Sequence, residues 1–437
     1  MTLLFIALGL LIWAVTSISI DYFDYTTFIV REQKFPDSLK FPAVTVCNLN
    51  RYAKSKFQEN LNYNEDQIFQ ATVFADALST RSILNVDINL TESAAAFTND
   101  VAAFAAGGFT QFSHDIENML WSCYFNNTPC SVSNFTTKIN VNGKCFTFND
   151  NTSETLYTST PGAEHGLELV LNVEQYDYFL SSASSVGVKV YIHRQGDFPY
   201  FGEHLGFTAS PGFHTDVLLN SEEFTYLQPP YGTCQKELRL DYFEIYTREA
   251  CLDECRTKVL IKLCGCRMFY MPGNATVCSP NDYTLCGFEV LTNFWKNHKC
   301  DCPTPCYIPD SYQHTLSYAL FPAQHFPSLI ERAGVLNNRL PAIPDFILTT
   351  DANNVTRFNE NRTQDFFRDN FLKITLYYNQ LSRNSYAEIQ EYETFQFIAD
   401  FGGHLGLFTG AGFLTLFEII AVCLGVFQPA DNEQVHS

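Results

Sequence analysis

Positive charge is scarce in this chain of 437 residues. Lys and Arg number 27 against 47 Asp and Glu, so the formal net charge is −20. Nucleic-acid binding requires a basic face, so the sequence excludes nucleic acid as a partner. An acidic surface suits a protein that concentrates cations, although many secreted domains are acidic simply for solubility.

Motifs of common hydrolases are also missing. The sequence has no G-x-S-x-G elbow, no H-E-x-x-H and no Cys/His arrangement outside its cysteine cluster, so we expect no enzyme. C-x-C at Cys264/Cys266 and at Cys300/Cys302 offers zinc ligands, but the usual C-x₂-C pairs are lacking. We therefore expect neither a metal nor a cofactor.

Cysteine, in contrast, is abundant. Fourteen of the 15 cysteines lie between Cys47 and Cys306, and Cys251 and Cys255 are one helical turn apart, so their thiols face the same way. The same region carries seven N-x-S/T sequons, at Asn89, Asn126, Asn134, Asn151, Asn274, Asn354 and Asn361. Together they predict an oxidised, glycosylated, extracellular segment.

Two apolar segments bracket that region. The first, Leu3–Ile20, has no charge and covers about 27 Å as a helix, enough to cross a bilayer. A signal peptide is the alternative, although no basic region precedes it. The second, 395–427, contains only Asp400, His404 and Glu418 as ionisable groups. It is longer than a bilayer needs, so we expect part of it to project or the helix to break.

These segments predict an α+β membrane protein. We expect a first transmembrane helix at 1–20, an extracellular domain at 21–393, a second, pore-lining transmembrane helix at 394–427 and a cytoplasmic tail at 428–437.

The middle of the chain reads mainly as β-structure. Short alternating runs punctuated by Gly and Pro predict strands over most of 140–240, and also at 41–50 and 368–382. Helical spacing predicts short helices within 59–120 and a helix within 315–350.

The second apolar segment carries polar and small residues on one helix. Asp400, His404, Leu407 and Ala411 recur at helical spacing and form one face. Ionisable groups inside a membrane cost several kcal/mol unless they face water or a partner. We therefore expect copies of this helix to surround a pore, with a ring of carboxylates that attracts cations. An anchor helix packed through small residues is the alternative.

Two sets of residues follow from the pore interpretation. The expected pore-lining residues are Asp400, Gly403, His404 and Leu407. The glycines that permit close packing are Gly402, Gly403, Gly406, Gly410 and Gly412.

Motifs along nearly the whole chain resemble the degenerin/epithelial sodium channel superfamily, most closely its acid-sensing ion channels. FPAVTVCNLN, LGFTASPGFHT, YLQPPYGTC, CGCRMFYMPG and FGGHLGLFTGAG occur in the family's order. The resemblance implies a trimer of identical or related subunits, each with a β-rich palm, a disulfide-rich helical thumb at about 246–315, a helical finger and knuckle, and two membrane helices. It also implies a multi-pass plasma-membrane channel that is selective for sodium and sensitive to amiloride-like blockers.

The resemblance further implies a pairing for the fourteen cysteines. The implied pairs are Cys47–Cys145, Cys123–Cys130, Cys234–Cys306, Cys251–Cys302, Cys255–Cys300, Cys264–Cys286 and Cys266–Cys278.

Several pore positions follow from the resemblance. Gly410-Ala411-Gly412 occupies the Gly-x-Ser selectivity filter, with Gly412 in place of Ser. Asp400 matches the acidic residue at the outer pore, and Ala399 matches the position where bulk holds degenerins open. Gly406 matches the position linked to block by amiloride.

Gating positions follow in the same way. Tyr25 and Tyr231 match the aromatic pair at the wrist, and Leu381-Ser382 matches the two-residue palm linker that flips during desensitisation.

His404 stands where the family commonly has Gln. Three imidazoles in a trimer would make conductance sensitive to pH or zinc, although a helix-packing role is the alternative.

The stimulus is the least determined property. Thr26 and Thr27 replace a histidine of proton-gated relatives. Clustered carboxylates would bind protons or calcium, with a solvated acidic surface as the alternative. Peptide gating, constitutive or mechanical gating, and a cell-surface receptor without a pore remain alternatives. The candidate acidic residues are Glu32, Asp241, Glu244 and Glu289.

Overall fold

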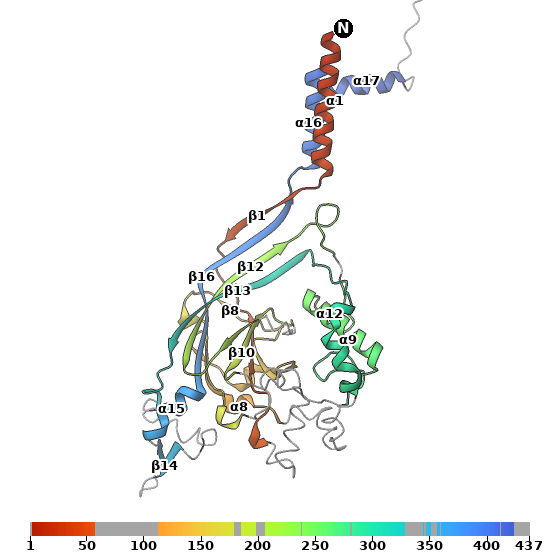
Figure 1. Cartoon of the computed structure of the whole chain (residues 1–437). Helices are drawn as coiled ribbons and strands as arrows, with labels where there is room; N and C mark the ends of the chain where they lie inside the picture. The colour runs from red at the N-terminus through yellow and green to blue at the C-terminus, as the bar shows by residue number, and fades with distance from the viewer. Residues whose placement is uncertain are drawn as a thin grey trace, which may run out of the picture. The chain divides into compact units, whose positions relative to one another are not determined.

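The computed structural model describes most of the chain, with gaps (Figure 1). The chain forms two compact units. The first combines Met1–Arg31, Thr225–Lys236 and Tyr386–Ser437, and the second combines Glu32–Phe224 and Glu237–Ser385. The described residues are 2–56, 112–178, 185–197, 206–236, 238–279, 282–327, 344, 347–350, 356–358, 360–410 and 412–423.

Most of a seven-stranded sheet lies in the second unit. Its strand order is β13-β12-β16-β9-β4-β5, and β1 pairs with β16 off this order. The strands are β1 (Thr27–Lys34), β4 (Leu120–Phe125), β5 (Thr128–Pro129), β9 (Leu167–Asn172), β12 (Phe213–Thr225), β13 (Tyr307–Leu320) and β16 (Phe371–Gln390).

A five-stranded sheet lies in the same unit, in the order β11-β10-β3-β7-β6. All six residues of β3 are buried, as expected for a strand of alternating β-branched and small residues with neighbours on both edges. The strands are β3 (Ala43–Asn48), β6 (Phe135–Asn140), β7 (Gly143–Phe148), β10 (Val188–His193) and β11 (Phe207–Ala209).

The main core draws on both sheets. Val46 and Phe146 come from the five-stranded sheet, and Leu169, Leu219 and Ile374 come from the seven-stranded one. All five are almost inaccessible to solvent, and burial of this kind contributes roughly 1.5–3 kcal/mol per large apolar side chain.

Short elements complete the second unit. They are β2 (Leu39–Lys40), α8 (Ile116–Met119), η2 (Val132–Asn134), β8 (Tyr157–Thr158), η3 (Ala163–His165), η4 (Gln175–Asp177), β14 (Leu348–Thr350), β15 (Thr356–Phe358) and α15 (Glu360–Asn370). The strands predicted at 41–50, over much of 140–240 and at 368–382 are therefore present. Most of the helices predicted within 59–120 lie outside the described residues.

One predicted helix is wrong in part. Residues 315–320 continue strand β13, because this segment pairs with β12 in the seven-stranded sheet rather than packing as a helix. The sequence-based thumb boundary near 315 therefore falls inside a strand that begins at Tyr307.

A disulfide-rich helical segment precedes β13. Helix α9 (Arg248–Cys264) begins at Thr247, whose side chain accepts a hydrogen bond from the Ala250 N–H, and ends at Gly265 with φ +74°. The π-helical turn η5 (Tyr283–Gly287), α11 (Phe288–Thr292) and α12 (Phe294–Asn297) follow.

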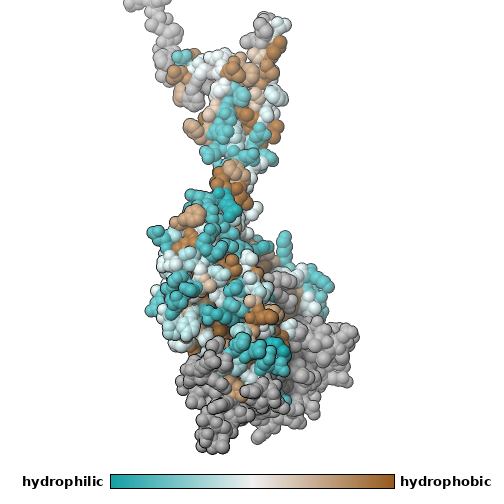
Figure 2. Space-filling model, turned by 90° about the vertical axis from the view of Figure 1, so that its left-hand side faces the viewer, coloured by the Kyte–Doolittle hydropathy of each residue, from teal (hydrophilic) through white to brown (hydrophobic). Residues whose placement is uncertain are grey.

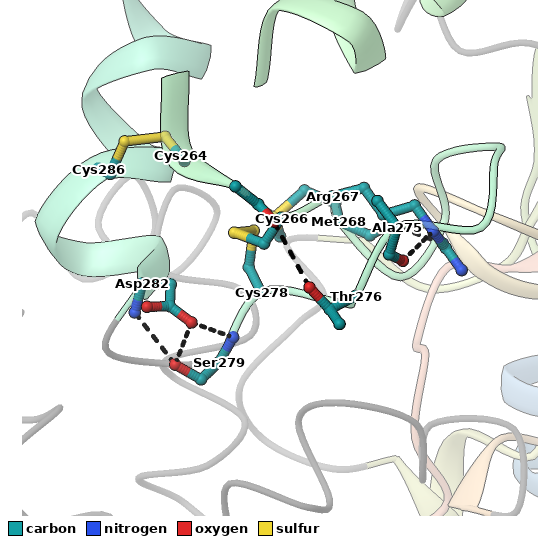
Figure 3. The surroundings of a disulfide bond; sticks show 11 residues. Cys264, Cys266, Arg267, Met268, Ala275, Thr276, Cys278, Ser279, Asp282 and Cys286 are labelled. Atoms are coloured by element: carbon teal, nitrogen blue, oxygen red, sulfur yellow. Dashed lines mark hydrogen bonds between the residues drawn. A yellow bond between two sulfur atoms is a disulfide. The ribbon is translucent and has the colours of Figure 1, made fainter. Parts of the chain in front are cut away.

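Disulfides fasten this segment. Figure 3 shows Cys264–Cys286 beside Cys266–Cys278, with the Ser279 hydroxyl donating to Asp282 Oδ2 (2.6 Å) nearby. The other bonds in the structure are Cys47–Cys145, Cys123–Cys130, Cys251–Cys302 and Cys255–Cys300, and Cys234 and Cys306 are each disulfide-bonded as well. The six pairs agree with those that the family resemblance implies.

The first unit contains the apolar helices α1 (Thr2–Phe23), α16 (Thr394–Thr409) and α17 (Phe413–Cys423). Among the described residues, one helical stretch, Phe5–Phe23, is long and apolar enough to cross a membrane. Large apolar side chains such as Trp13 and Leu414 are exposed on these helices, and Figure 2 shows part of the apolar surface in brown. Such surface requires lipid or a protein partner.

Two of the disulfides predict a cooperative effect on stability. Cys251–Cys302 encloses Cys255–Cys300, so removing either pair leaves the long loop closed. Replacing both pairs with Ser should lower the free energy of unfolding by roughly 1–2 kcal/mol more than the sum of the single replacements. Thermal unfolding of the purified chain tests this, and strict additivity would contradict it.

Candidate functional site

The second apolar segment is interrupted where the sequence predicts a filter. Helix α16 ends at Gly410, which has φ +70°, and α17 begins at Phe413. The Gly410 N–H donates to Gly406 O (2.9 Å), and the Gly412 N–H donates to the Thr415 hydroxyl (3.3 Å). A left-handed residue ends the helix at this point, and glycine adopts that conformation without strain. Ala411 lies outside the described residues.

One face of α16 is exposed in the described part of the chain. Ala399, Gly403 and Leu407 are exposed and recur every four residues, with Leu407 76% exposed. A Cβ atom added at Gly402 or Gly403 would meet nothing within 4 Å. Packing inside the subunit therefore does not require these glycines, which leaves the face open for another helix or for solvent.

The expected pore residue Asp400 lies beside that open face and is already engaged. Tyr392 donates its hydroxyl proton to Asp400 Oδ2 at 2.6 Å. His404 lies one turn further along, and its ring stacks on Phe408 of the same helix at 6.1 Å. Of the predicted pore-lining set, Gly403 and Leu407 are exposed, whereas Asp400 and His404 are half-buried.

The outer ends of α1 and α16 are joined by aromatic side chains. The Tyr22 ring stacks on Phe397 at 4.5 Å, and the Tyr22 hydroxyl lies 3.0 Å from the Thr394 hydroxyl. Tyr25 and Tyr231, expected to form a pair, meet edge to face at 5.1 Å. Tyr25 has φ +52°, an uncommon backbone conformation for a tyrosine at the turn between α1 and β1.

Glu388 holds this turn region together, a role that the sequence analysis missed. One carboxylate oxygen accepts the Thr27 hydroxyl proton (3.0 Å), and the other accepts the Leu227 N–H (2.8 Å). Gly232 is needed beside it, since a Cβ there would lie 2.0 Å from Leu227 O. An acidic residue near the end of a long strand gives no signal by which sequence alone would find it.

The expected palm linker is part of a continuous strand. Leu381 and Ser382 lie inside β16, where Ser382 is buried and Leu381 packs against the main core. The next residue, Arg383, pairs with Glu223 (3.3 Å) on β12 and with Asp310 (3.2 Å) on β13. These ion pairs join three neighbouring strands at the position of the expected linker.

The pattern typical of the family described as "Amiloride-sensitive sodium channel" matches residues 1–422. The chain belongs to the amiloride-sensitive sodium channel family.

Two curated proteins are similar to the chain along most of its length. Acid-sensing ion channel 1C of Danio rerio is 30% identical over 427 residues, which cover 94% of this chain and 75% of that protein. Acid-sensing ion channel 2 of Homo sapiens is 29% identical over 434 residues, covering 94% and 78%. These matches support a sodium channel, and a family of ion channels agrees with the expectation that the chain is not an enzyme.

The chain was also compared with solved structures. One match, titled "Cryo-EM structure of a proton-activated chloride channel", covers 98% of this chain and 95% of the matched chain. Its identity is 8% and its TM-score 0.34, too low to support a conclusion about this sodium channel family member.

The acidic residues predicted to bind protons or calcium are exposed, and two of them lie near a lysine. Asp241 pairs with Lys258 at 2.5 Å, and its side chain is 73% exposed. Glu244 and Glu289 are exposed, and Glu32 lies near Lys34 at 3.6 Å. Within the described ranges, no three His, Cys, Asp or Glu residues are placed to hold a metal ion.

A different carboxyl group has the properties of a proton site. Burial raises the pKa of Asp253 in α9 to about 6, against the attraction of Arg256. Its Oδ2 is buried without a hydrogen-bond partner. By contrast, burial lowers the pKa of His193 to about 4, so this histidine stays neutral during mild acidification. No sequence pattern marks Asp253, because only the fold buries it.

The sequons that the structure describes are compatible with glycosylation. Asn126, Asn134, Asn151 and Asn274 are exposed. Asn361 lies in α15, whereas Asn89 and Asn354 lie outside the described residues.

The raised pKa of Asp253 predicts a pH-dependent stability. A group whose folded pKa exceeds its unfolded value stabilises the fold below the unfolded pKa of about 3.9, and this contribution is lost as pH rises through about 6. Asp253→Asn should therefore raise the melting temperature at pH 7.5 and change it little at pH 4. Thermal unfolding of the detergent-solubilised chain measures the difference, and an equal effect at both pH values would contradict the assignment.

The left-handed Gly410 predicts a backbone effect on selectivity. Gly410→Ala places no atom against a neighbour, so its effect arises from a conformational cost of about 1–2 kcal/mol. Such a cost changes a conformational equilibrium about 5- to 30-fold, so the sodium-to-potassium permeability ratio should fall severalfold. The control is Gly402→Ala, a helical glycine with equally open surroundings. Reversal potentials in the two salts test this, and identical shifts in both variants would exclude a filter role.

Proposed function

We propose that the chain is one subunit of a trimeric, sodium-selective cation channel of the plasma membrane. The observation that carries this proposal is the interruption of an apolar, two-part helix at Gly410–Gly412, in a chain of the amiloride-sensitive sodium channel family. Backbone groups released by a broken helix are tolerated at membrane depth where they line a water-filled path.

The second membrane span consists of α16 and α17 together. Neither is long enough alone, with 16 and 11 residues, but both are apolar and expose large hydrophobic side chains such as Phe395, Leu407 and Phe417. Residues 21–393 are then extracellular, in accord with the disulfides and the exposed sequons, and residues 428–437 are cytoplasmic.

Three copies of α16 surround the pore. The open face of Ala399, Gly403 and Leu407 supports this arrangement, because it is exposed among the described residues of the subunit and has room for another helix. Gly410, Ala411 and Gly412 form the filter, and Gly406 contributes to block by amiloride-like compounds. The partners are identical or related subunits, and membrane lipid covers the remaining helix surface.

The stimulus that the structure favours is extracellular acid. Asp253 titrates in the range of mild acidification and lies on a helix fastened by disulfides at Cys251, Cys255 and Cys264. Protonation removes a buried charge and changes the packing of this helix. Movement then reaches β16 at Leu381-Ser382 and the Tyr25–Tyr231 pair before the pore opens. A peptide agonist, mechanical or constitutive gating are the alternative outcomes of the test.

Modification of Ala399 tests the pore assignment without a known stimulus. Ala399→Cys treated with a bulky thiol reagent should produce a standing, amiloride-sensitive sodium current in voltage-clamped cells, because the residue lies on the open face of α16. Ile398→Cys is the matched control, since Ile398 is 51% exposed on a different face.

An unchanged current at Ala399, or an equal response at Ile398, would contradict the proposed pore. Stepwise acidification, followed by a panel of short peptides in the same cells, then distinguishes the stimuli. Acid activation that Asp253→Asn abolishes would support the proton site.

A further inference from the structure

The hydrogen bond between Tyr392 and Asp400 joins the segment before α16 to the second turn of that helix. The 2.6 Å distance between the two oxygens is typical of a hydroxyl bonded to a charged carboxylate. Tyr392 precedes the first residue of the helix, Thr394, and its side chain therefore runs along the helix to reach Asp400.

Aromatic contacts fix the position of the Tyr392 ring. It lies edge to face with Tyr22 of α1 at 6.2 Å and with Phe397 of α16 at 6.4 Å. Burial, together with the nearby carboxylates of Asp400 and Asp21, raises the pKa of Tyr392 to about 12. The phenol thus remains a donor at every physiological pH.

The same short segment continues directly from the sheet. Strand β16 ends at Gln390, and the Glu391 N–H donates to Thr26 O at 3.0 Å. Tyr392 follows immediately. A displacement of this segment therefore moves the hydroxyl that holds Asp400.

We propose that Tyr392 is a positioning residue that holds the Asp400 carboxylate against its own subunit and thereby weakens the attraction of the outer pore for cations. This inference rests on the proposed channel function. When the bond is made, one carboxylate oxygen is occupied and the group is tied to Tyr392 of its own chain. When the bond is broken, the carboxylate is free to turn toward the open face of Ala399, Gly403 and Leu407 and to ligate a cation.

Block by external calcium tests this, because calcium prefers carboxylate oxygens. The assay uses the standing current of modified Ala399→Cys channels, and the half-blocking calcium concentration does not depend on expression level. Tyr392→Phe keeps the ring and removes the hydroxyl. It should lower the half-blocking concentration about tenfold, a factor that corresponds to about 1.4 kcal/mol.

Two further variants separate positioning from general packing. Tyr22→Phe removes a different hydroxyl contact between α1 and α16, the one with the Thr394 hydroxyl. It leaves the hydrogen bond between Tyr392 and Asp400 in place, so calcium block should not change. Asp400→Asn keeps an acceptor for Tyr392 and removes the charge. In that background, Tyr392→Phe should have no further effect on block.

The outcomes distinguish this inference from the proposed function. If the parent channel gives no current after modification, the proposed function and this inference both fail. If the parent channel conducts but calcium blocks the Tyr392→Phe channel at the same concentration as the parent, only the positioning role is overturned. An equal shift in Tyr22→Phe, or a shift that persists with Asp400→Asn, overturns it as well.

Discussion

The pairing of β16 within the seven-stranded sheet is the constraint on which most of the structure depends. Its first half, from Phe371 to Tyr378, is buried almost completely between β12 and β9. Its second half carries Arg383 and Glu388, whose ion pair and hydrogen bonds attach neighbouring segments to it. The strand ends at Gln390 and α16 begins at Thr394, so α16 follows within four residues the strand that organises the core.

Electrostatics in this chain are settled locally rather than by its net charge of −20. Glu254 is buried and accepts from Lys258, which also pairs with Asp241. The exposed pair of Lys258 with Asp241 contributes little, whereas a carboxylate left buried without a full set of partners, such as Asp253, changes its proton affinity strongly. The distribution of burial, rather than the number of acidic residues, therefore determines where protons bind.

The glycines of α16 and the segment after it serve different physical purposes. Gly410 adopts a left-handed conformation that ends the helix, whereas a Cβ atom added at the helical Gly402 or Gly403 would meet no described atom within 4 Å outside their own stretch of helix. The first kind of glycine is explained by the backbone of one subunit. The second kind is not required by packing among the described residues.

Helices and strands that are marked by a pattern of neighbouring residues could be predicted from the amino-acid sequence alone. Alternation in FPAVTVCNLN predicted β3, helical spacing placed Cys251 and Cys255 on one side of α9, and the excess length of the second apolar segment predicted that it projects or that its helix breaks. The order of the motifs along the chain indicated the sodium channel family. Features that depend on distant partners became visible only in the folded chain. Strand β13 replaces part of a predicted helix because it pairs with β12, and Asp400 accepts a hydrogen bond from Tyr392 instead of facing open solvent. Glu388 and Asp253 were identified through their long-range contacts and their burial. Spacing in a sequence reports which residues share a face, but only the folded chain sets which of them are covered, paired or left exposed.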